Sequence, residues 1–416
     1  MARLAVLGGT PLCTHPFPEW PQRGEREVEL LSEVVRSGHY GFFSGDKQFR
    51  FQQAFAHFQG ARFGIAVSNA TVGLQVALLA AGVGPGDEVI VPAFTWVATA
   101  SVALFVGAIP VFAEIDAETF CLDPQAAEAA ITSRTGAIIP VHLYGCMADL
   151  DAFMDLSEKY KIPIIEDCAH AHGSQWRGQG AGSMGHLGVF SFQETKTMSS
   201  GEGGILLTSD PTLEALCHSF INCGRLRPGD HLPQRVLGYN FRVTEFQAAV
   251  LLAALERLED QTRKREDHAR VLDRYLAEIE GILPMRRDPR VTRQGFYVYT
   301  FRWEPEAWGG ATRDQFLVAL QAEGIPINPL YTPVYRSELF PNASRFYPQV
   351  VGQVYAELRL PITEQVAEQV AVGLPHRVLL GSEQDVIAVV EAVAKLGANI
   401  DELRRVPVVS PSTLRD

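Results

Sequence analysis

Seven short apolar runs in the first half of this 416-residue chain constrain its fold more than any other feature. They are Ile65–Val67, Val89–Pro92, Pro110–Ile115, Ala137–Leu143, Ile162–Ile165, Val189–Phe192 and Ile205–Leu207. Each run has the length of a buried strand, and most gaps between the earlier runs can hold a helix. Strands that alternate with helices predict an α/β fold with a mostly parallel central sheet.

Two longer segments are typical of helices. The segment Asn69–Ala81 has apolar residues at helical spacing, and a Pro-Gly-Asp turn at 85–87 follows it. The region Thr244–Ile279 is compatible with a helix throughout. We expect this second helix to link a large α/β domain, residues 1–250, to a smaller α+β C-terminal domain, residues 251–416.

Composition and charge indicate which kinds of partner the protein can bind. The net charge of −12 argues against a nucleic-acid binder, because neutralising phosphates requires clustered Lys and Arg. Apolar runs fall short of the roughly 18 residues of a membrane span, and the first residues lack the apolar region of a signal peptide. The six cysteines form no CxxC pair and do not suggest a disulfide framework. These features predict a cytoplasmic protein that acts on small molecules, without nucleic-acid or membrane partners.

Lysine is rare in this chain, and Lys196 has a context that the other five lysines lack. It follows the apolar run Leu187–Phe192 and precedes the small-residue segment Ser199–Gly204, where backbone can approach a ligand closely. A lysine that loses solvent there has a lowered pKa, and its free amine can attack a carbonyl. Taken by itself, this pattern fits a nucleophilic amine and a structural lysine equally well.

Three further positions at predicted strand ends suit a flat ligand that carries a phosphate. Asp167 ends the run Ile162–Asp167, and a carboxylate there can pair with a protonated pyridine nitrogen. The segment Ser68–Thr71 precedes a helix, whose free N–H groups suit a phosphate. Trp96 follows a strand end and can stack on a flat ring. The plainer alternatives are helix caps or an ion pair for the first two, and simple core for Trp96.

Two other patterns resemble known sites. The segment Gly180–Gly185 matches a dinucleotide fingerprint, but it precedes an apolar strand instead of following one and opening a helix. Cys168, His170 and His172 resemble metal ligands, yet alternate residues of an extended segment point to opposite faces. We therefore expect neither a dinucleotide nor a metal at these positions.

In chain order, these segments resemble the sugar and cyclitol aminotransferases of the DegT/DnrJ/EryC1/StrS family. The resemblance covers nearly the whole chain, and it implies a fold-type I enzyme that depends on pyridoxal 5′-phosphate. The most specific stretches are Ser68–Thr71, Pro92–Trp96, Pro140–Gly145, Glu166–Gly173 and Ser191–Gly204.

The resemblance also implies roles for individual residues. Lys196 would hold the cofactor as a Schiff base, and Asp167 would pair with the pyridine nitrogen. The segment Gly238–Arg242 resembles the one whose Asn reaches the phosphate of the neighbouring subunit, so Asn240 implies a homodimer with shared active sites. The other implied cofactor contacts are Trp96 on the ring, His170 near the ring hydroxyl, and Ala70, Thr71 and Ser191 at the phosphate.

The chain departs from the common family pattern at Ala70, where Gly is usual, and at His170, where more members carry Gln. The Ala-His-Ala-His-Gly segment is similar to that of the inosose aminotransferases and the aminohydroxybenzoate synthases. This subgroup implies ping-pong transfer of an amino group from L-glutamine or L-glutamate to a keto-cyclitol such as scyllo-inosose or 2-deoxy-scyllo-inosose. Tyr331 and His376 are the predicted acceptor contacts. The alternatives are a nucleotide-keto-sugar acceptor, aminohydroxybenzoate synthesis and a non-catalytic cofactor-binding module.

Overall fold

The computed structural model of the chain describes residues 3–225, 236–350, 353 and 355–407. Its central sheet has the strand order β3-β2-β4-β5-β8-β9-β1, in which isolated parallel bridges join β4 and the residues after it to β5. The strands are β1 (Phe63–Val67), β2 (Glu88–Pro92), β3 (Ile109–Ala113), β4 (Thr135–Ile138), β5 (Ile165–Asp167), β8 (Leu187–Ser191) and β9 (Gly204–Thr208).

Most neighbouring strands of this sheet run parallel, as the sequence predicted. The pairs β2·β3, β2·β4 and β5·β8 are parallel, whereas β9 is antiparallel to both of its neighbours, β8 and β1. Each predicted run overlaps a strand or its sheet bridges, but β4 ends at Ile138, before Pro140, and β5 begins at Ile165, after Pro163. Proline has no N–H for a strand ladder, which accounts for both shorter strands.

Alternate residues of the strands enter different cores on the two faces of the sheet. Ile65 and Val67 of β1 pack with α3 and α4, whereas Ala66 between them packs with α2 and α8. A strand buried on both faces needs apolar residues at every position, which explains the continuous runs. The helices around the sheet are α1 (Glu25–Ser37), α2 (Lys47–Gln59), α3 (Ala70–Ala80), α4 (Val97–Phe105), α5 (Pro124–Ala129), α6 (Leu150–Tyr160) and α7 (Pro211–Ile221).

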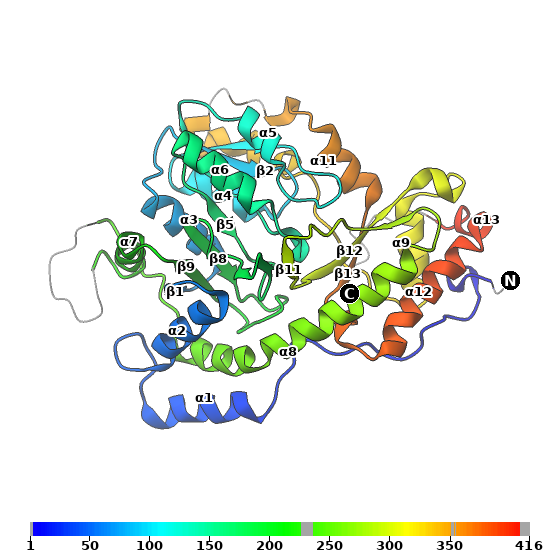
Figure 1. Cartoon of the computed structure of the whole chain (residues 1–416), viewed down its shortest axis with the longest axis horizontal. Helices are drawn as coiled ribbons and strands as arrows, with labels where there is room; N and C mark the ends of the chain where they lie inside the picture. Colours follow the sequence, from blue (N-terminus) through cyan, green and yellow to red (C-terminus); the bar gives the residue numbers. More distant parts are fainter. Residues whose placement is uncertain (1–2, 226–235, 351–352, 354, 408–416) are drawn as a thin grey trace.

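The long helix α8 (Glu245–Leu276) runs from the central sheet to the C-terminal half of the chain (Figure 1). Thr244 caps it, and Gln247 completes a capping box, so its predicted start is confirmed. The antiparallel sheet β10-β12-β13 follows, and a small sheet has the strand order β11-β6-β7. The remaining elements are β6 (Gln175–Trp176), β7 (Gln179–Gly180), β10 (Ile282–Pro284), β11 (Val291–Arg293), β12 (Val298–Trp303), β13 (Ala371–Pro375), α9 (Arg313–Ala322), α10 (Leu339–Asn342), α11 (Pro361–Gln365), α12 (Glu383–Gly397) and α13 (Ile400–Leu403).

Two segments pack away from their neighbours in sequence. Leu4 and Phe17 lie in the core built by α9, α12 and the β10-β12-β13 sheet. Conversely, Val334 and Tyr335 lie in the core of α3, α4 and the central sheet. A division of the chain at residue 250 therefore stays a prediction.

Among the described residues, no helix combines the length and apolar character that crossing a membrane requires. All six cysteines carry free thiols, as their spacing predicted.

Candidate active site

A pocket of about 730 Å³ opens where the parallel strands of the central sheet end. The ends of β5 and β8 supply Asp167 and Ser191 to it, and the loop after β8 supplies Lys196. Carboxyl ends of parallel strands meet at one edge of a sheet, which explains why residues distant in sequence converge here. The pocket brings together eight residues that the sequence predicted for the site, namely Ala70, Thr71, Trp96, Asp167, His170, Ser191, Lys196 and Tyr331.

One end of the pocket is the beginning of α3. The side chain of Asn69 caps this helix by accepting a hydrogen bond from the N–H of Val72 at 3.0 Å. This cap leaves the N–H groups of Ala70 and Thr71 to face a ligand. A Cβ on Gly204 would lie 2.8 Å from the nitrogen of Ala70, so glycine there lets β9 approach the helix end. Together with the Ser191 hydroxyl, this end suits a phosphate.

Asp167 lies on the pocket wall with only 5% of its surface exposed. Its Oδ2 accepts a hydrogen bond from the Thr99 hydroxyl at 2.9 Å, and its Oδ1 accepts one from the N–H of Ala169 at 3.1 Å. Burial raises the pKa of Asp167, while these two donors and the charge of Lys196 act in the opposite direction. The carboxylate is thus oriented at both oxygens and is desolvated, so a cation brought against it would bind strongly.

Lys196 lines the same pocket and lies in the loop between β8 and β9, residues 192–203, which we call the lysine loop. Burial lowers the pKa of Lys196 to about 8, although the charge of Asp167 favours the ammonium form. Its Nζ lies 4.2 Å from the centre of the Tyr297 ring. An amine with this pKa is partly unprotonated near neutral pH, which is the form that attacks a carbonyl.

His170 contributes a donor to the same pocket. The backbone N–H of Tyr144 donates to Nδ1 of His170 at 3.2 Å, so the neutral ring carries its proton on Nε2. Burial lowers the pKa of His170 well below its ordinary value and keeps the ring neutral. Nε2 lies 3.4 Å from the Tyr331 hydroxyl, beside the pocket. A neutral imidazole with this tautomer presents an N–H to the pocket.

The suggested metal trio does not share one site. His170 lines the pocket, whereas Nε2 of His172 donates to the carbonyl of Ser191 at 2.8 Å. A different group, His142, Glu166 and Cys168, has donor atoms close enough together for a metal ion. However, Nε2 of His142 already bonds Glu166 at 2.9 Å, and the Glu166 oxygens also accept the N–H groups of Gly182, Met184 and Gly185. The His142 and Glu166 atoms that a metal ion would need therefore already form hydrogen bonds, which hold the loop of residues 182–185.

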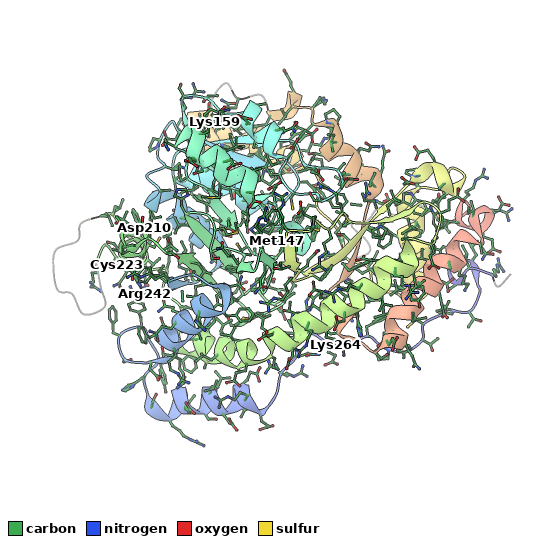
Figure 2. The ribbon with its side chains drawn as sticks, in the orientation of Figure 1. Met147, Lys159, Asp210, Cys223, Arg242 and Lys264 are labelled. Carbon is green, nitrogen blue, oxygen red and sulfur yellow. The ribbon has the colours of Figure 1, made fainter. Side chains whose placement is uncertain are left out.

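Two predicted residues lie outside the pocket lining. His376, predicted to contact the acceptor, lies behind the lysine loop, where its Nε2 is 3.2 Å from the carbonyl oxygen of Thr195. Asn240 is exposed and pairs with Asn222 in an antiparallel bridge. Arg242 holds this bridge by donating to Oδ1 of Asn222 at 3.0 Å, and it lies beside Cys223 (Figure 2). The contact of Asn240 with a partner subunit stays a prediction.

Sequence reasoning missed two residues that contact the predicted machinery. Thr99 bonds Asp167 from the first turn of α4, and its neighbour Thr95, 3.2 Å away, also lines the pocket. Thr95 precedes the N-cap Trp96 of α4, so the signal that the two threonines share is their place at the strand-to-helix junction after β2. Tyr297 contacts Lys196 and stacks on His170 with ring centres 4.2 Å apart. It comes from the C-terminal half of the chain, where the sequence analysis singled out Tyr331 and His376 but not Tyr297.

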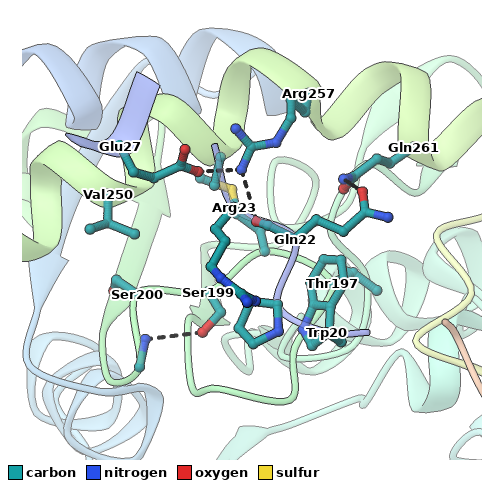
Figure 3. Close-up of a pocket in the computed structure, with 14 residues that line it drawn as sticks. Trp20, Gln22, Arg23, Glu27, Thr197, Ser199, Ser200, Val250, Arg257 and Gln261 are labelled. Atoms are coloured by element: carbon teal, nitrogen blue, oxygen red, sulfur yellow. Dashed lines mark hydrogen bonds and ion pairs between the residues drawn. The ribbon is translucent and has the colours of Figure 1, made fainter. Parts of the chain in front are cut away.

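A smaller pocket, of about 210 Å³, lies between the lysine loop and α8 (Figure 3). Residues that precede α1 fill one side of it, and Nε1 of Trp20 donates to the carbonyl of Glu194 at 3.1 Å. Arg257 of α8 pairs with Glu27 and also bonds the carbonyl of Gln22. The N-terminal segment therefore packs against the lysine loop on the side of α8.

Comparison with known proteins agrees with this geometry. The model of the DegT/DnrJ/EryC1/StrS aminotransferase family matches residues 21–394. A protein of Streptoalloteichus tenebrarius, provisionally named L-glutamine:3-amino-2,3-dideoxy-scyllo-inosose aminotransferase, is 42% identical over 97% of this chain and 100% of its own length. L-glutamine:2-deoxy-scyllo-inosose aminotransferase of Micromonospora echinospora is 39% identical over 97% of this chain and 100% of its own length.

Solved structures give the same picture. The crystal structure of 3-amino-5-hydroxybenzoic acid synthase superposes with a TM-score of 0.83 at 34% identity, covering 92% of this chain and 99% of that one. An aminotransferase from Psychrobacter cryohalolentis superposes with a TM-score of 0.84 at 30% identity, covering 93% and 100%. The family match spans most of the chain, and these relatives are aligned over nearly their whole length. The chain therefore belongs to the DegT/DnrJ/EryC1/StrS family of aminotransferases, and its fold is that of the fold-type I enzymes.

Proposed function

We propose that this aminotransferase moves the amino group of L-glutamine to a keto-cyclitol of the scyllo-inosose type, using pyridoxal 5′-phosphate held by Lys196. One observation carries the proposal. A single pocket contains a lysine with a lowered pKa, a buried carboxylate with two donors, and a free helix end. The names of the relatives supply the donor and the class of acceptor.

The residues present fit the cofactor. The beginning of α3 and the Ser191 hydroxyl offer N–H and O–H donors to a phosphate, while Asp167 offers a carboxylate to a protonated ring nitrogen. Trp96 lines the same pocket with 57% of its surface exposed, which leaves its ring free to stack on a flat ligand. When bound, pyridoxal phosphate supplies an aldehyde and an electron-withdrawing ring.

In this proposal Lys196 has two tasks. Its amine would hold the cofactor covalently, and when free it would move a proton to and from the reacting carbon. Thr99 and Ala169 donate to Asp167 and favour its charged form against desolvation, and the carboxylate would stabilise a positive ring nitrogen. His170 orients the ring by donating from Nε2.

The lining favours an uncharged polyol as the acceptor. Of the described residues that line the pocket, Lys196 is the only lysine or arginine. A nucleotide diphosphate would need cationic partners, which this protomer does not offer in the described lining. Hydroxyl groups can instead bond neutral side chains, and the lining offers Gln193, Thr195, Asn328 and Tyr331.

We also propose that the enzyme is a homodimer with shared active sites and that it acts in the cytoplasm. Support for the dimer comes from Asn240, which the family pattern assigns to the partner's phosphate site, and from Leu237 nearby, which is 84% exposed. Exposed apolar residues beside such a segment are typical of an interface. Free thiols on all six cysteines suit a reducing compartment.

The visible absorption spectrum of the purified protein tests the covalent role of Lys196. Wild type reconstituted with pyridoxal phosphate should show the band of lysine-bound cofactor, and L-glutamine should bleach it. Lys196→Ala should bind the cofactor but not pass through this cycle. Lys159→Ala, which alters an exposed lysine paired with Glu128, is the matched control and should behave as wild type. Absence of the band in reconstituted wild type would refute the proposal.

Acceptor class is tested by product formation with a panel of ketones. Inosose ketones should be aminated, while nucleotide-linked keto-sugars should not be. The reverse preference would overturn the cyclitol assignment and leave the aminotransferase assignment intact.

Mixing two inactive variants tests the shared site. Lys196→Ala and Asn240→Ala homodimers should each have low activity. Their hybrid should regain activity, because one of its sites combines an intact Lys196 with the partner's intact Asn240. A mixture that shows only the summed activity of the two parents, after subunit exchange is verified by mass, would contradict sharing.

A further inference from the structure

The antiparallel pair β12 and β13 ends against the lysine loop. Val298 pairs with Pro375, so the preceding Tyr297 and the following His376 lie side by side at the end of the sheet. Their ring centres are 6.2 Å apart and their planes differ by 30°. Neither residue belongs to the central sheet that supplies Lys196 and Asp167.

Both residues bond Thr195, the residue before Lys196. The Tyr297 hydroxyl lies 2.9 Å from Oγ1 of Thr195. The Thr195 hydroxyl itself donates to Oε1 of Gln193 at 2.8 Å, so Tyr297 is the donor in its own bond. The carbonyl of Thr195 can only accept, so His376 donates to it from Nε2 at 3.2 Å. Two donors therefore hold the side chain and the backbone of Thr195.

The Tyr297 ring also contacts the amine of Lys196, at 4.2 Å from the ring centre. A cation within about 6 Å of an aromatic ring is attracted by its quadrupole, so this contact favours the ammonium form. The charged or titratable groups that act on the same amine are Asp167, which favours the ammonium form, and His170 and His172, whose protonation Lys196 opposes.

We propose that Tyr297 and His376 are positioning residues for Lys196: together they fix Thr195, and the Tyr297 ring stabilises the ammonium form of the lysine when the amine is not bound to the cofactor. This inference rests on the proposed function for the chemistry that Lys196 performs. It also gives His376 a role that its position behind the loop permits. The end of the β12·β13 pair thereby positions the loop that carries the reactive amine and contributes to the protonation of that amine.

The test measures the pKa of Lys196 in the full-length chain without cofactor. Competitive labelling with acetic anhydride at several pH values, followed by peptide mass spectrometry, reports the fraction of free amine at this lysine. Tyr297→Leu removes the ring and should lower the labelling midpoint of Lys196 by about half a unit to one unit. Tyr297→Phe keeps the ring and should leave the midpoint unchanged. Tyr297→Phe should nevertheless reduce kcat by roughly threefold to tenfold, because the hydrogen bond from its hydroxyl to Thr195 is lost.

The matched control is Tyr299→Phe. Tyr299 lies two residues further along the chain, within β12, and is more deeply buried than Tyr297, but its hydroxyl bonds Asp273 at 2.8 Å instead of Thr195. If Tyr297→Leu leaves the midpoint of Lys196 in place, or if Tyr299→Phe lowers it as much, the proposal is wrong. Tyr297→Met is a second ringless variant should Tyr297→Leu fail to fold. Labelling is measured without cofactor, so it tests the role of Tyr297 even if wild type never forms the lysine-bound band. Absence of that band would count against the proposed function alone.

Discussion

The backbone N–H of Tyr144 donates to Nδ1 of His170 across 3.2 Å and thereby fixes the tautomer of a pocket histidine. The two rings are also stacked, with centres 5.7 Å apart and an interplanar angle of 6°. Tyr144 has a left-handed backbone, with φ of 57°, at this point of the His-Leu-Tyr-Gly segment. The His-Leu-Tyr-Gly segment thus acts on the site through its backbone.

His170→Gln should be mild, because the amide can supply the N–H that Nε2 supplies now. We expect cofactor binding within about threefold of wild type, whereas His170→Phe should weaken it by roughly tenfold. Titration of each variant with pyridoxal phosphate, followed by absorption, measures both constants. Equal losses in the two variants would show that the N–H is not what matters at this position.

Asp167→Asn should lower kcat by on the order of 100-fold or more, since a neutral amide cannot stabilise a positive ring nitrogen. Thr99→Val should have a smaller effect. It removes one donor to the carboxylate and should raise the pKa of Asp167 by about one to two units. The acid limb of the pH–rate profile should move to higher pH in Thr99→Val. If it does not move, the titration of Asp167 does not control that limb.

Stability should fall as the pH drops below about 6.5, because buried neutral histidines take up protons on unfolding. Burial lowers the pKa of His172 from its ordinary 6.5 to about 3, so the folded state resists the proton that the unfolded chain binds. Above pH 6.5 this histidine does not lower the free energy of unfolding. Below pH 6.5 it lowers that free energy by about 1.4 kcal/mol per pH unit. Burial raises the pKa of Asp167, which acts in the opposite sense, so a variant is needed to isolate His172.

The comparison is between wild type and His172→Phe in urea unfolding from about pH 7.5 to about pH 5.5. The variant should lose less stability over this range, by roughly the contribution of one histidine. His57→Gln is the control, since the His57 side chain is exposed in the folded chain, and its slope should match wild type. Identical slopes for His172→Phe and wild type would mean that folding does not shift the pKa of His172.

Trp96→Leu should weaken binding of pyridoxal phosphate by roughly threefold to tenfold, while Trp96→Phe should lose less because a flat ring remains. The unfolding free energy should change little in either variant, because 57% of the Trp96 surface is exposed without a ligand. Titration followed by absorption gives the affinity, and thermal unfolding without cofactor gives the stability. A large loss of stability would assign Trp96 to the core.

The central sheet and one end of the site could be predicted from the sequence because both depend on local pattern. Continuous apolar runs identified the strands, and strand-to-helix junctions placed Ser68–Thr71 and Trp96 at strand ends. Cofactor roles for single residues depended on the family resemblance, since spacing alone left plainer alternatives open for Lys196 and Asp167. Prolines at 140 and 163 shortened two of the predicted strands.

Contacts between distant segments needed the tertiary structure. Tyr297 and His376 flank the paired strands β12 and β13 of another sheet, and periodicity along the chain carries no information about which loop that sheet approaches. Gly145 shows the same limit. A Cβ there would lie 2.6 Å from the nitrogen of Phe296, a close approach that only the folded chain reveals.

The sequence by itself determined where strands and helices form and which residue types stand at the carboxyl ends of the strands, because burial and capping act over a few neighbouring residues. The tertiary structure alone decided the protonation of Lys196 and His170, the donors to Asp167 and the contact of Tyr297 with the amine. Desolvation and hydrogen bonds depend on what packs against a group in space, and that neighbour is usually far away in the chain.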